Sequence, residues 1–204
     1  MRDTVRTALV IAILFLPATS LMADLEKGLA AYNEADYATS LAECLPIAEQ
    51  GDPVAQFCVA RLYGNGFGVA MDDALALKWY GLAAEQGHSE AQFNLGVMYA
   101  NGWGVPMNDE EAAKWYRLSA EQGLVSAQKA LANVCKNGRG VALSIAEAYQ
   151  WYFVAGELGD RDAAYKAEEL AGKVNADDLL AAQHIAESWV EKLGGKTMQA
   201  GRID

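Results

Sequence analysis

The chain has 204 residues, of which 27 are acidic and 16 are basic, so its formal net charge at neutral pH is −11. Such an acidic chain repels a phosphate backbone, and the sequence contains no cluster of lysine and arginine that would overcome this. We therefore expect no nucleic-acid partner, and a partner with a basic or neutral surface suits the charge better. The length is sufficient for one domain with a sizeable core.

The first residues of the chain predict a secretory signal peptide. Arg2 and Arg6 precede a short apolar run, and small residues follow it. The apolar run is shorter than the roughly 20 residues that a membrane-spanning helix needs. We expect residues 1–23 to be cleaved, leaving no membrane span, with cleavage after Ser20 as the alternative to cleavage after Ala23. The protein would then be periplasmic or secreted.

The middle of the chain consists of three blocks of 36 residues that align without a gap: 52–87, 88–123 and 124–159. Each block carries Ala-Gln near its start, then a G-x-G-V run, and then a Trp-Tyr pair before a closing glycine. The apolar spacing after Ala-Gln indicates a first helix, and glycine adopts the left-handed conformation that ends helices. The Trp-Tyr pair indicates the packed middle of a second helix.

The repeated pattern A-x-x-x-L-G-x-x-Y-x-x-G-x-G-V, followed by W-Y and A-E-Q-G, resembles the Sel1-like repeat, a relative of the tetratricopeptide repeat. The middle block matches the pattern best. The resemblance implies an all-α fold, a right-handed α/α superhelical solenoid of antiparallel helix pairs. It also implies a protein-interaction scaffold or regulatory adaptor and not an enzyme.

The segments on either side of the repeats are expected to cap the solenoid, because its end units would otherwise expose apolar faces. Residues 24–51 form a degenerate repeat and predict an N-terminal capping helix pair. Residues 160–193 predict two C-terminal capping helices. Gly194 and Gly195 are expected to end the last helix, and residues 194–204 are expected to form a flexible tail.

The three cysteines are Cys44, Cys58 and Cys135, so at most one bridge can form. Cys44 and Cys58 lie on helices expected to face each other, which makes them the candidate disulfide in an oxidising compartment. Their equivalents in the next repeat, Tyr80 and Asn94, suggest different faces, and a disulfide needs Cα atoms within about 7 Å, so the bridge stays open. The cysteine spacing is not that of a zinc site, and no metal is expected.

No group of residues in the sequence predicts catalysis or a cofactor. The glycine-rich runs follow helices instead of strands, which is not the context of a dinucleotide-binding loop. His88 and His184 lie far apart in the sequence, and position 88 is occupied by different residue types in the other repeats. We therefore assign no catalytic residue, no cofactor and no metal ligand. A cell-envelope hydrolase with a cryptic active site and a small-ligand sensor remain as alternatives.

The partner-binding surface is expected on the first helix of each repeat, since one helix of each pair lines the concave side of such a solenoid. Residues on the face opposite the packing positions are the candidates: Arg61, Asn65, Glu90, Asn94, Val97, Asn101, Asn133 and Asn137. Trp103, in a glycine turn, is a further candidate contact. The alternative is a solvated face on which three of the asparagines end their helices. We expect the protein to act as a monomer.

Overall fold

The computed structural model describes the backbone of residues 18–200 and the side chains of residues 21–194. The described part of the chain forms ten α-helices and no strand, which confirms the predicted all-α fold. The helices are α1 (Ala18–Asn33), α2 (Tyr37–Glu49), α3 (Pro53–Asn65), α4 (Asp73–Glu85), α5 (Ser89–Asn101), α6 (Asp109–Ala120), α7 (Val125–Asn137), α8 (Ile145–Glu157), α9 (Arg161–Ala171) and α10 (Ala176–Ala200).

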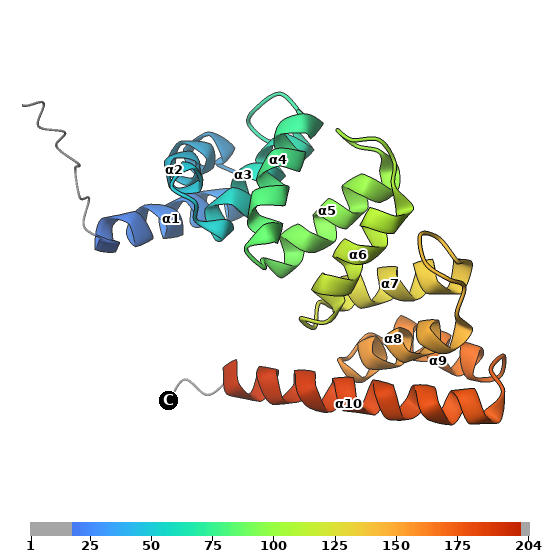
Figure 1. Cartoon of the computed structure of the whole chain (residues 1–204). Helices are drawn as coiled ribbons and strands as arrows, with labels where there is room; N and C mark the ends of the chain where they lie inside the picture. The colour runs from blue at the N-terminus through green and yellow to red at the C-terminus, as the bar shows by residue number, and fades with distance from the viewer. Residues whose placement is uncertain (1–17, 201–204) are drawn as a thin grey trace, which may run out of the picture.

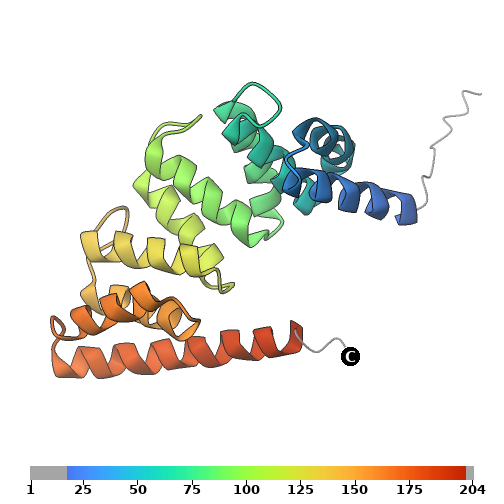
Figure 2. The ribbon, with the colours of Figure 1, turned by 180° about the vertical axis from the view of Figure 1, so that it is seen from behind.

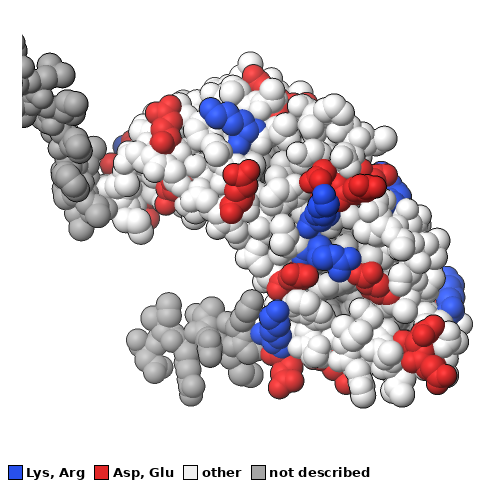
Figure 3. Space-filling view, viewed as in Figure 1, with Lys and Arg blue, Asp and Glu red and all other residues white. Residues whose placement is uncertain are grey.

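Consecutive helices pack against each other along the whole chain from α1 to α9, as a solenoid of helix pairs requires. The pairs follow one another around an arc, with α1 near one end and α10 at the other (Figures 1 and 2). The last helix departs from this order, because α10 packs mainly on α8. The space-filling view shows that the arc is hollowed on one side (Figure 3).

The expected signal peptide, residues 1–23, lies largely outside the described residues. Residues 18–23 form the first turns of α1, and the two cleavage points considered above fall within these turns. No helix in the described range is long and apolar enough to span a membrane.

The glycine turns end the first helix of each repeat by the expected mechanism. In the middle repeat, Gly102 adopts φ +72°, and its backbone N–H bonds to the carbonyl of Met98 in the last turn of α5. The chain then turns back, and the N–H of Asn108 bonds to the carbonyl of Tyr99 at 2.9 Å. The Asn108 side chain accepts from two backbone N–H groups at the start of α6, so one short turn caps both helices.

The core between the helices is built from small residues facing rings. A Cβ atom added at Gly96 of α5 would lie 2.7 Å from the ring of Tyr116 in α6, so only glycine permits this approach. The equivalent residues Ala60 and Ala132 are fully buried. Tyr152 of the third Trp-Tyr pair is also buried. The packed position expected for the Trp-Tyr pair is confirmed at Tyr152.

The C-terminal prediction is wrong in one respect, because α10 does not end at Gly194 and continues to Ala200. Leu193 is 3% exposed and packs with Val154 and Ala186, and its side chain lies against Gly123 of the second repeat. Each glycine in a helix costs only about 1 kcal/mol, and this packing holds the helix at the position where the sequence suggested a stop. Residues 201–204 of the expected tail lie outside the described residues.

Candidate partner-binding surface

The Arg61 side chain lies among rings contributed by two successive first helices. Its guanidinium carbon is 4.1 Å from the centre of the Tyr32 ring in α1 and 5.5 Å from that of Phe57 in α3. Among the described side chains, no carboxylate forms an ion pair with Arg61. Rings attract the cation through its charge, and a guanidinium has more N–H donors than the neighbouring Tyr32 hydroxyl can accept, so donors remain for another molecule.

A cavity of about 260 Å³ opens beside this arginine. Its walls include Tyr32 from α1, Phe57 and Arg61 from α3, and His88 and Glu90 from the start of α5. Two of the predicted partner-binding residues, Arg61 and Glu90, therefore share one cavity. The cavity also shows that α1, α3 and α5 present a continuous surface, which we call the first-helix surface and define by Tyr32, Phe57, Arg61, Glu90 and Asn94.

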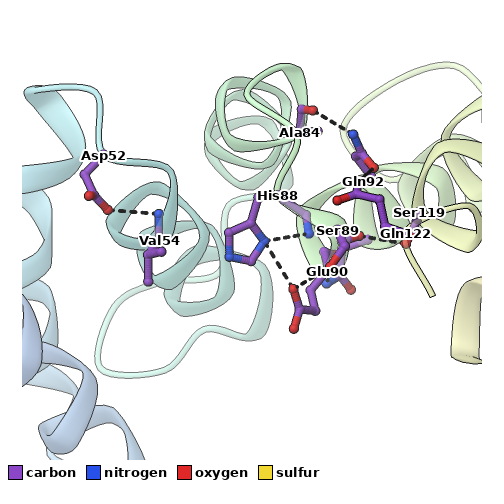
Figure 4. Close-up of polar contacts among 11 residues, drawn as sticks. Asp52, Val54, Ala84, His88, Ser89, Glu90, Gln92, Ser119 and Gln122 are labelled. Carbon is purple, nitrogen blue, oxygen red and sulfur yellow. Dashed lines mark hydrogen bonds and ion pairs between the residues drawn. The ribbon is translucent and has the colours of Figure 1, made fainter. Parts of the chain in front are cut away.

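His88 has a structural role that the sequence analysis missed. Its Nδ1 accepts a hydrogen bond from the backbone N–H of Ala91 at 3.3 Å, so the side chain caps α5, and its ring stacks on Phe57 with centres 4.5 Å apart. Figure 4 shows the ring beside Glu90, whose Oε2 lies 3.4 Å from the same nitrogen. Burial lowers the pKa of His88, which favours the neutral form that can accept this bond, and the Glu90 and Asp52 carboxylates oppose the shift in part.

The signal for this role was present in the sequence. Position 88 is equivalent to Asp52, whose carboxylate accepts from the N–H groups of Val54 and Ala55 at 2.9 and 2.8 Å at the start of α3. The position looked tolerant because the third repeat carries Leu124, which makes no side-chain cap. The repeat position before each first helix is therefore a capping position.

Cys44 and Cys58 are brought together by α2 and α3, and Cys58 is part of the cavity wall. Their sulfur atoms are 3.0 Å apart, and both residues are buried free thiols. The hydrogen bond donated by Cys44 lowers the pKa of Cys58 to about 7 and raises the pKa of Cys44. The facing arrangement fits the candidate disulfide, and the bridge itself stays a prediction.

Four predicted residues line a second, smaller cavity of about 110 Å³ between the first and second repeats: Asn65, Asn94, Val97 and Trp103. Trp103 is 51% exposed, as expected for a side chain available to a partner. The walls also include Asp73 and Tyr80, which the sequence analysis did not select. Burial raises the pKa of Tyr80 to about 12, so its hydroxyl stays protonated at neutral pH.

Three of the candidate asparagines are the last residues of their helices, as in the alternative of a solvated face. The side-chain amides of Asn65, Asn101 and Asn137 each donate to the backbone carbonyl four residues earlier, at 2.8, 2.7 and 2.9 Å. Asn133 accepts a hydrogen bond from the Tyr152 hydroxyl at 2.7 Å. Asn101, Asn133 and Asn137 are exposed, and the two cavities described above do not include them.

The second helices carry mixed charge. In Figure 3, basic and acidic side chains lie close together over α6. Arg117 pairs with Glu147 at 2.7 Å, and Lys114 pairs with Glu111 at 2.5 Å. A cavity of about 450 Å³ lies beside these residues, with the exposed Leu118 in its wall. The sequence carried no signal for this cavity, and its two cations, Lys114 and Arg117, are already paired with carboxylates.

In the described part of the chain, no three His, Cys, Asp or Glu residues are grouped so that they could hold a metal ion.

The family is decided by a match to the Sel1 repeat model at residues 53–88, 89–124 and 125–160, which together are 108 residues and more than half of the chain. The chain belongs to the Sel1 repeat family. Sel1 repeats generally mediate protein–protein interactions. Each matched unit begins one residue later than the predicted block, at the first residue of its first helix.

Solved structures show the same fold. The crystal structure of a Sel1 repeat protein from Oxalobacter formigenes matches with a TM-score of 0.67 and 36% identity, covering 71% of this chain and 57% of that one. A protective antigen present in uropathogenic Escherichia coli strains, which displays an SLR fold, matches with a TM-score of 0.53 and 25% identity, covering 90% and 49%. This chain thus spans less than two thirds of either protein. A comparison with functionally characterised proteins gave no match.

Proposed function

We propose that this Sel1 repeat protein is an exported, non-catalytic scaffold or regulatory adaptor that binds a protein or peptide through its first-helix surface. The observation that carries the proposal is Arg61, a cation held over two rings in the wall of a cavity without a carboxylate partner among the described side chains. The amino-terminal sequence supports export to the periplasm or out of the cell.

The chemistry of this surface suits an extended peptide. The N–H groups of Arg61 can donate to backbone carbonyls of a partner. Glu90 is exposed, and the side-chain amide of Asn94 bonds to the Glu90 carbonyl at 2.8 Å, which leaves the Asn94 oxygen as an acceptor for backbone N–H groups. The surface therefore presents a donor at Arg61 and acceptors at Glu90 and Asn94. The net charge of −11 favours a partner that is basic or neutral elsewhere.

Catalysis is left out of the proposal because the reactive groups at the cavity have structural contacts. The buried Cys58 thiol is hydrogen-bonded to Cys44, and Nδ1 of His88 caps α5. A general base must be within hydrogen-bonding reach of the proton that it removes. The protein is proposed to work as a monomer, since one chain supplies the whole surface.

The test compares two cations that each lie over a ring. Arg61→Ala removes the cation of the first-helix surface, and Lys78→Ala removes a cation 4.9 Å from the Trp79 ring on the second helix α4. Both variants are used as affinity baits on the native cell envelope with a chemical crosslinker. We expect Arg61→Ala to lose about tenfold or more of the partner captured by the wild type, with Lys78→Ala unchanged. Equal capture by two folded variants would refute the assignment of this surface.

A further inference from the structure

The glycine turn of each repeat rests on the first residue of the preceding second helix, and this junction occurs three times. The residue pairs at the junctions are 30 positions apart: Tyr37 and Phe67, Asp73 and Trp103, Asp109 and Arg139. The three junctions are therefore equivalent positions of one repeated structure with different side chains.

The backbone contacts at the junctions are also equivalent. A Cβ atom added at Gly68 would lie 2.7 Å from the Cβ of Tyr37, and one added at Gly104 would lie 2.5 Å from the backbone oxygen of Asp73. A Cβ atom at Gly140 would overlap the backbone of Asp109. Each turn thus lies directly on the start of the neighbouring helix, and the residue before the second glycine is placed beside the first residue of that helix.

Two of the junctions contain matched partners. At the first, the rings of Tyr37 and Phe67 stack with centres 4.6 Å apart and an interplanar angle of 14°. At the third, the guanidinium of Arg139 forms two hydrogen bonds to the Asp109 carboxylate, from Nε at 3.2 Å and from Nη2 at 2.7 Å. The pair raises the pKa of Arg139, as expected for a guanidinium held by a carboxylate.

The two side chains of the middle junction are not a complementary pair. Asp73 is a carboxylate, as at the third junction, but it faces the aromatic Trp103 where the third junction has Arg139. Asp73 forms no ion pair or side-chain hydrogen bond with any described residue, and Trp103, at the position of Arg139, is half exposed. The cavity of about 110 Å³ lies between them, and it is also lined by Asn65 and Asn94. The side-chain amides of both asparagines donate to their own helices, so their oxygens remain acceptors.

We infer that the cavity between Asp73 and Trp103 binds an arginine side chain of the partner. The third junction shows what this carboxylate position holds when the chain supplies the cation itself. A guanidinium in the middle cavity would bond to the Asp73 carboxylate, as Arg139 bonds to Asp109, and would stack on the face of Trp103. This inference rests on the proposed function, since it assigns one side chain of the proposed partner.

Another explanation for Asp73 is that a carboxylate stabilises the positive end of the helix dipole at the start of α4. That effect accounts for the acidic residue at both Asp73 and Asp109. It does not account for the cavity beside Asp73 or for a half-exposed tryptophan in its wall. A partner cation in the cavity would contact both the Asp73 carboxylate and the Trp103 ring.

The site is tested with N-acetyl-arginine amide as the probe and with its uncharged analogue, N-acetyl-citrulline amide, as the matched control. Binding is followed by the NMR signal of the Trp103 indole N–H, which is identified by its absence in Trp103→Phe. We expect saturable binding of the arginine probe in the millimolar range, about tenfold weaker binding of the citrulline probe, and a similar loss in Asp73→Asn. Asp109→Asn should bind the probe as the wild type does.

Equal binding of the two probes, binding that survives Asp73→Asn, or no change in the Trp103 signal would each overturn the inference. Equal binding of N-acetyl-lysine amide would overturn the choice of arginine.

A second variant uses the third junction as its template. Trp103→Arg supplies an internal cation, so saturation transfer from the protein to the arginine probe, which does not need the Trp103 signal, should be lost while the melting temperature stays close to that of the wild type. In the envelope capture experiment, this variant should also lose the partner. If Trp103→Arg captures the partner normally and Arg61→Ala does not, the partner arginine is excluded and the proposed function stands. If neither variant affects capture but the probe still binds the wild type, the proposed function fails, while the arginine-binding cavity itself stands.

Discussion

The Nε2 of Gln122 donates a hydrogen bond to Oε1 of the buried Gln92 at 2.7 Å, and Gln86 makes the same bond to Gln56 at 2.8 Å (Figure 4 shows the first). Each acceptor glutamine also donates to a backbone carbonyl of the preceding second helix. These bonds connect the end of each second helix to the start of its own repeat and satisfy polar groups that are removed from water.

The third repeat lacks the donor of this bond. Gln128 is fully buried, and its Oε1 has no hydrogen-bond partner, because the position of Gln86 and Gln122 is occupied by Leu158. We predict that Leu158→Gln is more stable than Leu158→Met by about 1 kcal/mol, since both lose the branched side chain and only glutamine supplies the donor. Urea unfolding of the two variants measures the difference. A Met variant as stable as the Gln variant would show that another group satisfies Gln128.

The capping bond of His88 predicts a pH dependence of stability. Burial holds the pKa of His88 below its ordinary value of 6.5, so the unfolded state takes up a proton before the folded state does. The stabilisation is therefore complete above about pH 6.5 and is lost as the pH falls through the lower folded-state pKa. The loss should approach the value of one helix cap, about 1 kcal/mol.

The control for this prediction is His88→Asn, which keeps a capping side chain that does not titrate. The free energies of unfolding of the two proteins should differ progressively between pH 7 and pH 5, measured by denaturant titration. Parallel curves would mean that His88 does not titrate with unfolding.

The glycine turn predicts a contrast between two glycines that both have positive φ. Gly104 and Gly159 have φ of +67° and +104°, but an added Cβ meets the backbone of Asp73 only at Gly104 and meets nothing within 4 Å at Gly159. Alanine costs backbone strain at both positions, on the order of 1 kcal/mol. We expect Gly104→Ala to be the more destabilising by at least about 1 kcal/mol in thermal unfolding, because the turn must also move. Similar melting temperatures would contradict the close approach of this turn to α4.

The facing thiols predict the outcome of oxidation. With oxidised glutathione, the Cys58 thiolate should attack one sulfur and release one glutathione, and Cys44 should then displace the second, leaving a protein disulfide and two reduced glutathiones. Thiol counting in denaturant should fall from three to one, with Cys135 remaining, since burial raises its pKa to about 12. The bridge closes a short loop and should add about 3 kcal/mol of stability. Three thiols after oxidation would exclude it.

The sequence predicted the repeated part of the fold because each repeated residue acts locally. Gly102 ends α5 through its own backbone conformation, and Gly96 is small because Tyr116 packs on it from the adjacent helix. Such contacts join neighbours in the sequence and recur in each copy. The course of α10 could not be predicted in the same way, because Leu193 is held by Gly123 and Val154, which are distant in sequence.

The candidate site was predicted in part for the same reason. Helical spacing selected Glu90 in the middle repeat, the 36-residue offset selected Arg61 in the first, and the structure gives them a common cavity. Spacing alone could not show that the ring of Tyr32 in α1 lies under Arg61, or that Asp73 lacks the cation that Asp109 has. Those features depend on which side chains meet between repeats.

A partner bound to the first-helix surface would lie within reach of a photoreactive group there, so site-specific photo-crosslinking can locate it. A photoreactive amino acid is placed at Glu90, on that surface, and in a matched protein at Glu85, an exposed residue at the end of the second helix α4. After illumination in the native envelope, we expect one discrete adduct from position 90 that is absent from position 85 and is lost when Arg61→Ala is added. An adduct from position 85 alone, or one from position 90 that persists in Arg61→Ala, would rule out binding at the first-helix surface.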